Sequence, residues 1–537
     1  MNKNDSFVPP PFPTDDLIRR MLVDRVDERR LSLGMVVGIT EANSHRFVAQ
    51  GCRDARTGGP VNERTIFEIG SITKLFTALL LADMANRGEV RLDEPVAELL
   101  PAGTRVPVRH GRAITLRDLA SHYSGLPREP TNLEYRPRNP YAGYTAEKLY
   151  QFLATHELIR TPGDSFEYSN LGVGLLAHAL VLRAGAGDYE NLIRDRILDP
   201  LRMDDTVIAL PSRLKANVAS GHDESLDPVP DWNSGVLAGA GAFRSNLSDL
   251  LRFMDALCDQ NSPISSMIGP LVTLRHQGGL ELGKPHPDGG IGLSHGGGTV
   301  GFRSFVGCIP EWKRGVAVLS NACIDAVVDL GGHVLDPRCG LIWHRKEAAI
   351  DPACFARLVG RYRLRPNWVF DVTSTAERLY VRLADQPAFR VFPTSEWDFF
   401  YKNVGAQLTF EPGEDGLAAR LILHQNSADQ IAERIGGPRT PIVHRNGRDA
   451  RGEPVGASEQ AVVVLLNDEQ TTMAFVAWIL ESVFGKTHEE AIDIMLATHR
   501  DGRGVCGVYA PEDADQFVKQ VTELAREHGH PLQCVRE

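Results

Sequence analysis

The sequence predicts a multidomain α+β protein, and three observations lead to this prediction. The chain has 537 residues, which is too long for one hydrophobic core. Up to about residue 345, β-like runs alternate with helical patterns, whereas short β-like runs alone follow from about residue 352. The last stretch again combines a strand-like run with amphipathic helical patterns. We expect domains at 15–345, 350–437 and 461–537, with a linker at 438–460.

In the first domain, the β-like runs lie at the two ends. "GMVVGITEA" comes early and "GVAVLSNA" comes late, and helical patterns such as "TAEKLYQFLATHEL" and "LSDLLRFMDALCD" lie between them. This order predicts a sheet closed by the terminal segments of the domain, with helices inserted between.

The second domain is predicted from alternation along its runs. Leu379, Val381 and Leu383 alternate with polar or larger residues in "RLYVRL", so one face of this strand is buried. Turn residues such as "PGEDG" separate the runs. The pattern favours a small antiparallel barrel or sandwich. The Pro-, Gly- and charge-rich segment after it is typical of a flexible linker.

Composition excludes several classes of function. The net charge of −11 argues against nucleic-acid binding, which needs a basic surface. No signal-peptide h-region and no run of about 18 apolar residues is found, so we expect a cytoplasmic protein without membrane contact. The eight cysteines form no CxxC, which favours reduced thiols over disulfides or a zinc site. We expect no metal and no cofactor.

The segment "FEIGSITKLFTALLLADMANRGEV" contains a candidate catalytic pair, Ser71 and Lys74. Residues three apart share a helix face, and a helix N-terminus favours developing negative charge. The alternative is that Ser71 only caps the helix. The S-x-x-K spacing is weak by itself, and Ser212–Lys215 repeats it, but no long apolar helix follows Ser212.

Two further segments carry candidate groups. Tyr168 and Asn170 precede an apolar helical run, and a tyrosine hydroxyl can act as a base or acid beside a cation. The alternative is a core tyrosine. "SHGGGTVG" carries His295 and Gly298, and glycines let backbone N–H groups approach a substrate. A glycine-rich hairpin with a surface histidine is the alternative there.

Together, these three segments resemble the serine β-lactamase and penicillin-binding-protein superfamily, and more closely its class C-like branch of esterases, D-aminopeptidases and peptidases. "ITLRDLASHYSGLP", "ILDPLRMDDT" and "AGAGAFRSNLSDLLRFM" support the resemblance. It implies a β-lactamase/transpeptidase-like sandwich, with Ser71 as the acylated nucleophile, Lys74 as proton acceptor and Tyr168 as partner base. Asn170 would orient substrate or lysine, His295 would replace the lysine of the third motif, and the N–H groups of Ser71 and Gly298 would form the oxyanion hole.

The replacement of Lys-Thr-Gly by His295-Gly296-Gly297 favours a peptidase or esterase over β-lactam hydrolysis. The 350–437 domain resembles the lipocalin-like domain found behind some of these peptidases. Two competing motifs lack their context: "GLSHG" is not followed by a helical pattern, and a strand-like run follows "GGGTVG".

The 461–537 block reads as strand, loop, helix, helix, strand, helix. On residue types alone, its methionines are core residues and Asp468 is a helix cap. However, "LLNDEQTTM", "AIDIMLATH", "GRGVCGVY" and "EHGHPLQC" closely resemble ClpS, the adaptor that recognises N-terminal degradation signals for the Clp protease. The resemblance implies that a peptide α-amino group is held by Asn467, Asp468 and His499. It also implies that Met473, Val476, Met495 and Leu532 line the side-chain pocket.

The sequence thus predicts a serine hydrolase, a peptidase or esterase, fused to a module that binds peptide N-termini and linked to protein catabolism. The expected partners are a peptide, ester or amide substrate, N-degron-bearing proteins and a Clp unfoldase. The alternative is an adaptor for the Clp protease whose hydrolase domain is a passenger or an acylation-only receptor.

Overall fold

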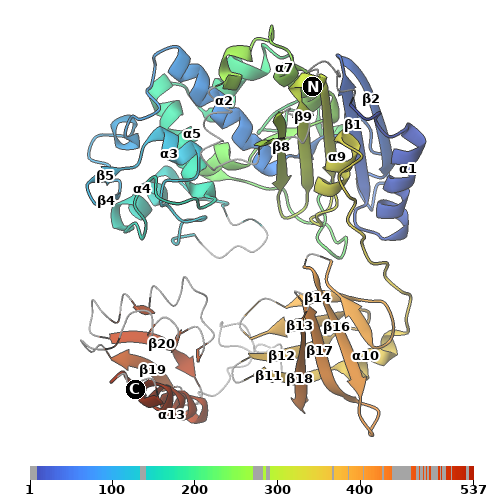
Figure 1. The fold of residues 1–537 in the computed structure, drawn as a ribbon, viewed down its shortest axis with the longest axis vertical. Helices are drawn as coiled ribbons and strands as arrows, with labels where there is room; N and C mark the ends of the chain where they lie inside the picture. The colour runs from blue at the N-terminus through green and yellow to red at the C-terminus, as the bar shows by residue number, and fades with distance from the viewer. Residues whose placement is uncertain are drawn as a thin grey trace, which may run out of the picture. The chain divides into compact units, whose positions relative to one another are not determined.

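The computed structural model divides the chain into two compact units, residues 1–346 and 347–537, which are described separately (Figure 1). The residues that it describes begin at position 9. They exclude 134–138, 140, 270–281, 286–290, 366–367, 385, 387, 403, 426–427, 438–460, 467–470, 472–475, 477–478, 481–482, 485–493, 496–497, 499–502, 510, 528–530 and 537. The predicted linker at 438–460 therefore lies outside the described residues.

The first unit is built on a six-stranded antiparallel sheet in the order β2-β1-β10-β9-β8-β7. As predicted, the two ends of the domain meet in it, because β1 pairs with β10 from Met35 opposite Ser320 to Glu41 opposite Arg314. The strands are β1 (Gly34–Glu41), β2 (Ser44–Gly51), β7 (Leu282–Pro285), β8 (Ile291–Gly298), β9 (Arg303–Ile309) and β10 (Arg314–Ser320).

Helices cover both faces of this sheet, which explains why β1 is apolar on both sides (Figure 1). Met35, Val37 and Ile39 pack with α1 (Asp15–Val23) and α9 (Val328–Leu335). The opposite face contributes Val36 to the main core, together with α7 (Leu247–Cys258).

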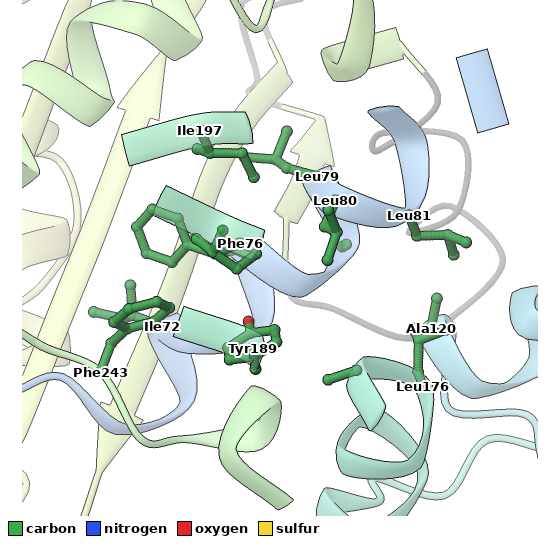
Figure 2. Packing of buried hydrophobic residues seen from close by; sticks show 14 of the residues in the cluster. Ile72, Phe76, Leu79, Leu80, Leu81, Ala120, Leu176, Tyr189, Ile197 and Phe243 are labelled. Atoms are coloured by element: carbon green, nitrogen blue, oxygen red, sulfur yellow. The ribbon is translucent and has the colours of Figure 1, made fainter. Parts of the chain in front are cut away.

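Helix α2 (Thr73–Asn86) is the centre of the main core (Figure 2). Every residue from Thr73 to Met84 is buried, as expected for a helix that is apolar all round. Phe76 stacks on Phe253 with ring centroids 4.8 Å apart and meets Phe243 at an edge. This packing fixes the first turn of α2, which carries the candidate catalytic pair.

The remaining α-helices of this unit are α3 (Leu116–Ala120), α4 (Ala146–Thr155), α5 (Asn170–Ala184) and α6 (Tyr189–Ile193). Of these, α5 and α6 contact α2 directly. Within the described part of the chain, no single helix is long and apolar enough to cross a membrane. One bent pair, Asn170–Ala184 with Tyr189–Leu198, passes by length and composition, and α5 is largely buried in the core.

The second unit contains a closed barrel of eight antiparallel strands, each paired with its neighbour in sequence. Leu379, Val381, Phe399 and Phe410 point into its core, which confirms the alternation seen in the sequence. The strands are β11 (Gly360–Arg365), β12 (Trp368–Ser374), β13 (Leu379–Leu383), β14 (Phe389–Pro393), β15 (Asp398–Phe400), β16 (Ala406–Pro412), β17 (Ala418–Gln425) and β18 (Ala428–Gly436). A short helix, α10 (Phe355–Leu358), precedes them.

The same unit ends in a small α/β module. Strand β19 (Ala461–Leu466) lies between β20 (Arg503–Tyr509) and β21 (Gln533–Arg536). Helix α13 (Pro511–Glu527) contributes Val521 and Ala525 to the core of this module. The predicted strand-helix order agrees where residues are described, and β21 is an additional strand that its short apolar pattern did not reveal.

Candidate active site

Ser71 lies in a 3-10 turn, η2 (Gly70–Ile72), that leads directly into α2. No side chain caps the N-terminus of η2 or of α2. Ser71 is therefore not the helix N-cap of the alternative prediction. Gly70 has φ +50°, a conformation that glycine adopts without strain. The turn therefore presents the Ser71 hydroxyl to other elements rather than to the backbone of α2.

Lys74 follows one turn later and points back to Ser71. Its Nζ donates to Ser71 Oγ at 3.0 Å, to Asn170 Oδ1 at 2.7 Å and to the carbonyl oxygen of Ala240 at 2.6 Å. The three acceptors come from η2, α5 and η6 (Gly235–Ala240), so the lysine joins these elements to α2. Only 1% of the Lys74 surface is exposed.

The burial of Lys74 has an electrostatic consequence. Loss of water disfavours its charged form and lowers the pKa of Lys74, which is the largest effect; the nearby Tyr168 hydroxyl and Glu129 carboxylate oppose the shift. A lysine with a lowered pKa can hold a neutral amine able to accept a proton.

Tyr168 reaches Ser71 from the segment before α5. Its hydroxyl donates to Ser71 Oγ at 2.9 Å. The ring is held from several sides: it stacks on His122 with centroids 4.5 Å apart, and Lys74 Nζ and Arg128 Cζ each lie 5.0 Å from its centroid. Tyr168 is thus not a plain core tyrosine, since its hydroxyl shares the Ser71 oxygen with Lys74.

Asn170 is the first residue of α5 and is held by a carboxylate that the sequence analysis did not single out. Its Nδ2 donates to Glu129 Oε1 at 2.6 Å and to the Tyr141 hydroxyl oxygen at 3.1 Å. The Tyr141 hydroxyl in turn donates to Glu129 Oε2 at 2.5 Å. Glu129 lies two residues after the phrase "ITLRDLASHYSGLP" that supported the family resemblance, and a charged residue at that place was the available signal.

Strand β8 brings the predicted glycines to the same place. A Cβ added to Gly70 would lie 2.6 Å from the backbone nitrogen of Gly298, so these two backbones are in close contact. A Cβ on Gly297 would lie 2.0 Å from the Ile69 carbonyl oxygen, whereas one on Gly296 would meet Val328 on the other face. Glycine at 297 is therefore required for the approach of β8 to the Ser71 turn.

His295 lies two residues before Gly297, and side chains two apart face the same side of a strand. The imidazole therefore lies on the face of β8 that receives the Ser71 turn. It is 7% exposed, and its Nδ1 lies 2.6 Å from the Gly296 carbonyl oxygen. His295 is buried, so it is not the surface histidine of the alternative prediction.

The competing motifs have other surroundings. Ser212 is exposed and is followed by a three-residue 3-10 helix, Lys215–Asn217. Ser294 lies within β8 and is followed by strand β9, as the sequence indicated. Ser212 therefore lacks the long helix that follows Ser71, and Ser294 lacks the strand-turn-helix arrangement of a nucleophile elbow.

In the C-terminal module, the structure describes three of the predicted peptide-binding residues. Val476, Met495 and Leu532 are 7%, 7% and 5% exposed and belong to one buried apolar cluster. Asn467, Asp468, Met473 and His499 lie outside the described residues.

Comparison with known proteins shows the family of the larger domain. Residues 18–326 match the family described as Beta-lactamase, which is more than half of the chain. The chain belongs to the beta-lactamase family. Its first domain is a β-lactamase-related serine hydrolase domain. Residues 344–435 match a family described only as a domain of unknown function.

Relatives of the β-lactamase-family domain include two bacterial proteins. The chain is 28% identical over 337 residues to the D-alanyl-D-alanine-carboxypeptidase/endopeptidase AmpH of Escherichia coli (strain K12), covering 56% of this chain and 85% of that protein. It is 27% identical over 410 residues to Penicillin-binding protein 4* of Bacillus subtilis (strain 168), covering 70% and 89%. The octameric penicillin-binding protein homologue from Pyrococcus abyssi shares the fold, with TM-score 0.51 and 21% identity over 77% of this chain and 99% of that one.

The C-terminal module is likewise shown to be ClpS-related. Residues 457–535 match the family described as ATP-dependent Clp protease adaptor protein ClpS. They are 56% identical over 75 residues to the ATP-dependent Clp protease adapter protein ClpS of Paraburkholderia phymatum, covering 14% of this chain and 72% of that protein. The beta-lactamase-family chain therefore carries a ClpS-family module.

Proposed function

We propose that the β-lactamase-family domain hydrolyses esters or peptide bonds through an acyl-enzyme on Ser71. The observation that carries this proposal is that Ser71 Oγ lies within hydrogen-bond distance of both Lys74 Nζ and the Tyr168 hydroxyl, at 3.0 and 2.9 Å. A serine flanked by two proton carriers is an activated nucleophile.

In the acylation step, Ser71 Oγ bonds to the substrate carbonyl carbon while its proton passes to neutral Lys74. The oxygen of the tetrahedral intermediate accepts hydrogen bonds from the N–H groups of Ser71 and Gly298. The bond to the leaving nitrogen or oxygen then breaks, and Tyr168 supplies the proton that the leaving group needs. Protonated Lys74 then gives its extra proton to the Tyr168 oxygen, which restores the neutral amine and the neutral hydroxyl.

Deacylation runs the same way with water as the nucleophile. Tyr168 and Lys74 take the proton of the water, and the proton returns to Ser71 Oγ as the acyl group leaves as a carboxylic acid. Asn170 accepts from Lys74 and keeps Nζ aligned with Ser71. His295, in place of a permanently charged lysine, favours a peptide or ester substrate over a β-lactam.

Hydrolysis of a panel tests this proposal: p-nitrophenyl esters, L- and D-aminoacyl anilides and a chromogenic cephalosporin. We expect turnover that Ser71→Ala abolishes, together with a mass increase of the wild-type protein by one acyl group after brief mixing. Ser212→Ala is the matched control, because it alters the second S-x-x-K serine and should leave turnover unchanged. Absence of Ser71-dependent turnover and of the acyl adduct would contradict the proposal.

We further propose that the ClpS-family module binds the N-terminal residue of peptides or proteins. Asn467, Asp468 and His499 would hold the α-amino group, and Met473, Val476, Met495 and Leu532 would contact the first side chain. The identity to a protein named as a Clp protease adapter supports this role. Burial of a charged amine needs several acceptors, which these polar residues supply.

Fluorescence anisotropy with peptides starting with Phe, Leu, Tyr or Trp tests the module. We expect binding that is lost when the peptide N-terminus is acetylated or when Asp468 is replaced by Ala. A pull-down with a Clp unfoldase N-domain tests the adaptor role: retention supports a handover to the Clp machinery, and no retention favours a hydrolase that works alone in the cytoplasm.

The fusion gives the two modules a common substrate in this proposal. The linker expected from the sequence at 438–460 would hold a captured peptide near Ser71 at an effective concentration on the order of millimolar. Cleavage of Phe- or Leu-starting peptides should slow when a protease site inserted at 438–460 is cut. Equal rates for cut and uncut protein would contradict this link.

A further inference from the structure

Glu129 places a carboxylate at the edge of the candidate site. Its side chain is 34% exposed, whereas Tyr141, which it contacts, is only 6% exposed. Oε1 accepts from Asn170 Nδ2 at 2.6 Å and Oε2 accepts from the Tyr141 hydroxyl at 2.5 Å. The carboxylate therefore has a fixed orientation and an accessible side.

The contacts of Glu129 change what Asn170 can offer to a substrate. A primary amide has two N–H donors and one acceptor oxygen. Both donors of Asn170 are engaged, one by Glu129 and one by Tyr141, and the oxygen accepts from Lys74. Asn170 has no remaining N–H with which to bind a carbonyl oxygen in the acyl part of a substrate.

Glu129 instead offers acceptors at this position. An ionised carboxylate has about four lone-pair sites, and two of these are used by Asn170 and Tyr141. Among the described residues, Arg128 is the cation paired with Glu129: its Nε is 3.8 Å from Oε1, and its guanidinium lies over the Tyr168 ring. Hydrogen-bond acceptors with negative charge select for donors with positive charge.

We infer that Glu129 is a specificity-determining residue that binds a protonated amino group in the acyl part of the substrate. The enzyme then prefers substrates with a free amino group, such as aminoacyl esters, aminoacyl amides and peptide N-termini, over their N-acylated counterparts. This inference rests on the proposed acyl-enzyme function of Ser71. It gives the hydrolase the same chemical preference, a free N-terminus, that is proposed for the ClpS-family module.

A matched pair of substrates tests the inference: an aminoacyl p-nitrophenyl ester or anilide with its amine free, and the same compound N-acetylated. We expect wild-type kcat/KM at pH 6.5 to favour the free amine by about tenfold or more, since hydrogen bonds to charged groups contribute about 1.5–3 kcal/mol. In Glu129→Gln, the ratio of kcat/KM for the free amine to kcat/KM for the acetylated compound should fall close to one. Glu98→Gln, at an exposed position in the helix Val96–Leu99, is the charge-matched control.

The pH dependence supplies a second readout. The preference should fall as pH rises through the pKa of the substrate amine, about 7.7–8.0 for an α-amino group. The titratable groups among the described residues around Glu129 are Tyr141, Arg128 and, through Asn170, Lys74. The pH profile of kcat/KM for the acetylated compound reports the effect of these enzyme groups. Dividing the free-amine profile by it leaves the pH dependence of the preference alone.

The outcomes separate this inference from the function on which it rests. If Glu129→Gln lowers kcat/KM for both compounds equally, Glu129 only positions Asn170 and the inference is wrong. If wild type hydrolyses both compounds equally, it is also wrong. Acylation of Ser71 by p-nitrophenyl acetate, which has no amine, checks the proposed function independently, and its absence overturns both.

Discussion

Lys74 Nζ donates to Ser71 Oγ across 3.0 Å while only 1% of the lysine is exposed. A buried lysine without a carboxylate in direct contact can keep its charge only at a cost. The geometry therefore couples the proton of Lys74 to the nucleophilicity of Ser71.

This coupling predicts an acid limb in the pH-rate profile. Burial lowers the pKa of Lys74, so the neutral amine forms below the usual lysine pKa of about 10.4. Since the neutral form is the proton acceptor, kcat/KM for a neutral ester should rise with pH and level off below that value. Lys74→Arg, which stays charged, should lose about 10²–10⁴-fold in kcat/KM at all pH values. A limb at or above the usual lysine pKa would contradict the prediction.

Tyr168→Phe should lower the catalytic rate without lowering the stability of the fold. The substitution removes the hydroxyl that lies 2.9 Å from Ser71 Oγ but keeps the ring that stacks on His122. We expect kcat to fall about 10²–10⁴-fold with little change in thermal unfolding temperature. Tyr150→Phe is the control, because its hydroxyl contacts His178 instead. Comparable losses in both variants would point to a general structural effect.

Two adjacent glycines of β8 should respond differently to alanine. At Gly297, a Cβ would lie 2.0 Å from the Ile69 carbonyl oxygen, so Gly297→Ala must push β8 away from the Ser71 turn and displace the Gly298 N–H. We expect a loss of about 10²–10³-fold in kcat, comparable with removal of an oxyanion donor. A Cβ on Gly296 would lie 3.3 Å from Val328 and 3.9 Å from the Ser304 carbonyl oxygen, so Gly296→Ala should keep most activity. Steady-state kinetics that rank the two the other way would exclude the assigned role of Gly298.

Asp249, a buried residue outside the candidate active site, should make the stability of the fold depend on pH. Burial raises the pKa of Asp249 to about 6, despite hydrogen bonds from Thr206 and the backbone of Asp205. In the unfolded chain the carboxyl titrates near 3.9. Its contribution to stability is thus full below pH 4 and is lost as pH rises through about 6. Relative to Asp249→Asn, wild type should lose unfolding free energy between pH 4 and 6 in urea titrations; parallel curves would contradict this.

Sequence patterns predicted the parts of the site that lie next to each other along the chain. The Ser71–Lys74 spacing predicted that the two side chains meet, and Lys74 Nζ in α2 lies 3.0 Å from Ser71 Oγ in η2. The Glu129–Tyr141–Asn170 network was not predicted, because its members are far apart in the sequence and the hydrogen bonds depend on tertiary packing. Alternating residues predicted a small barrel or sandwich, and the structure has a closed barrel; strand β21 has only four residues, too few for its alternation to be detected.

The pairing of β1 with β10 also has a consequence during protein synthesis. Met35 is opposite Ser320, so the first strand of the sheet has no partner on that side until nearly 300 further residues have left the ribosome. The growing chain must shield a strand with seven buried residues in a row for that time, which makes it a client for chaperones that bind extended apolar segments. A pause in translation after Ser320 would give this sheet time to close before the barrel emerges.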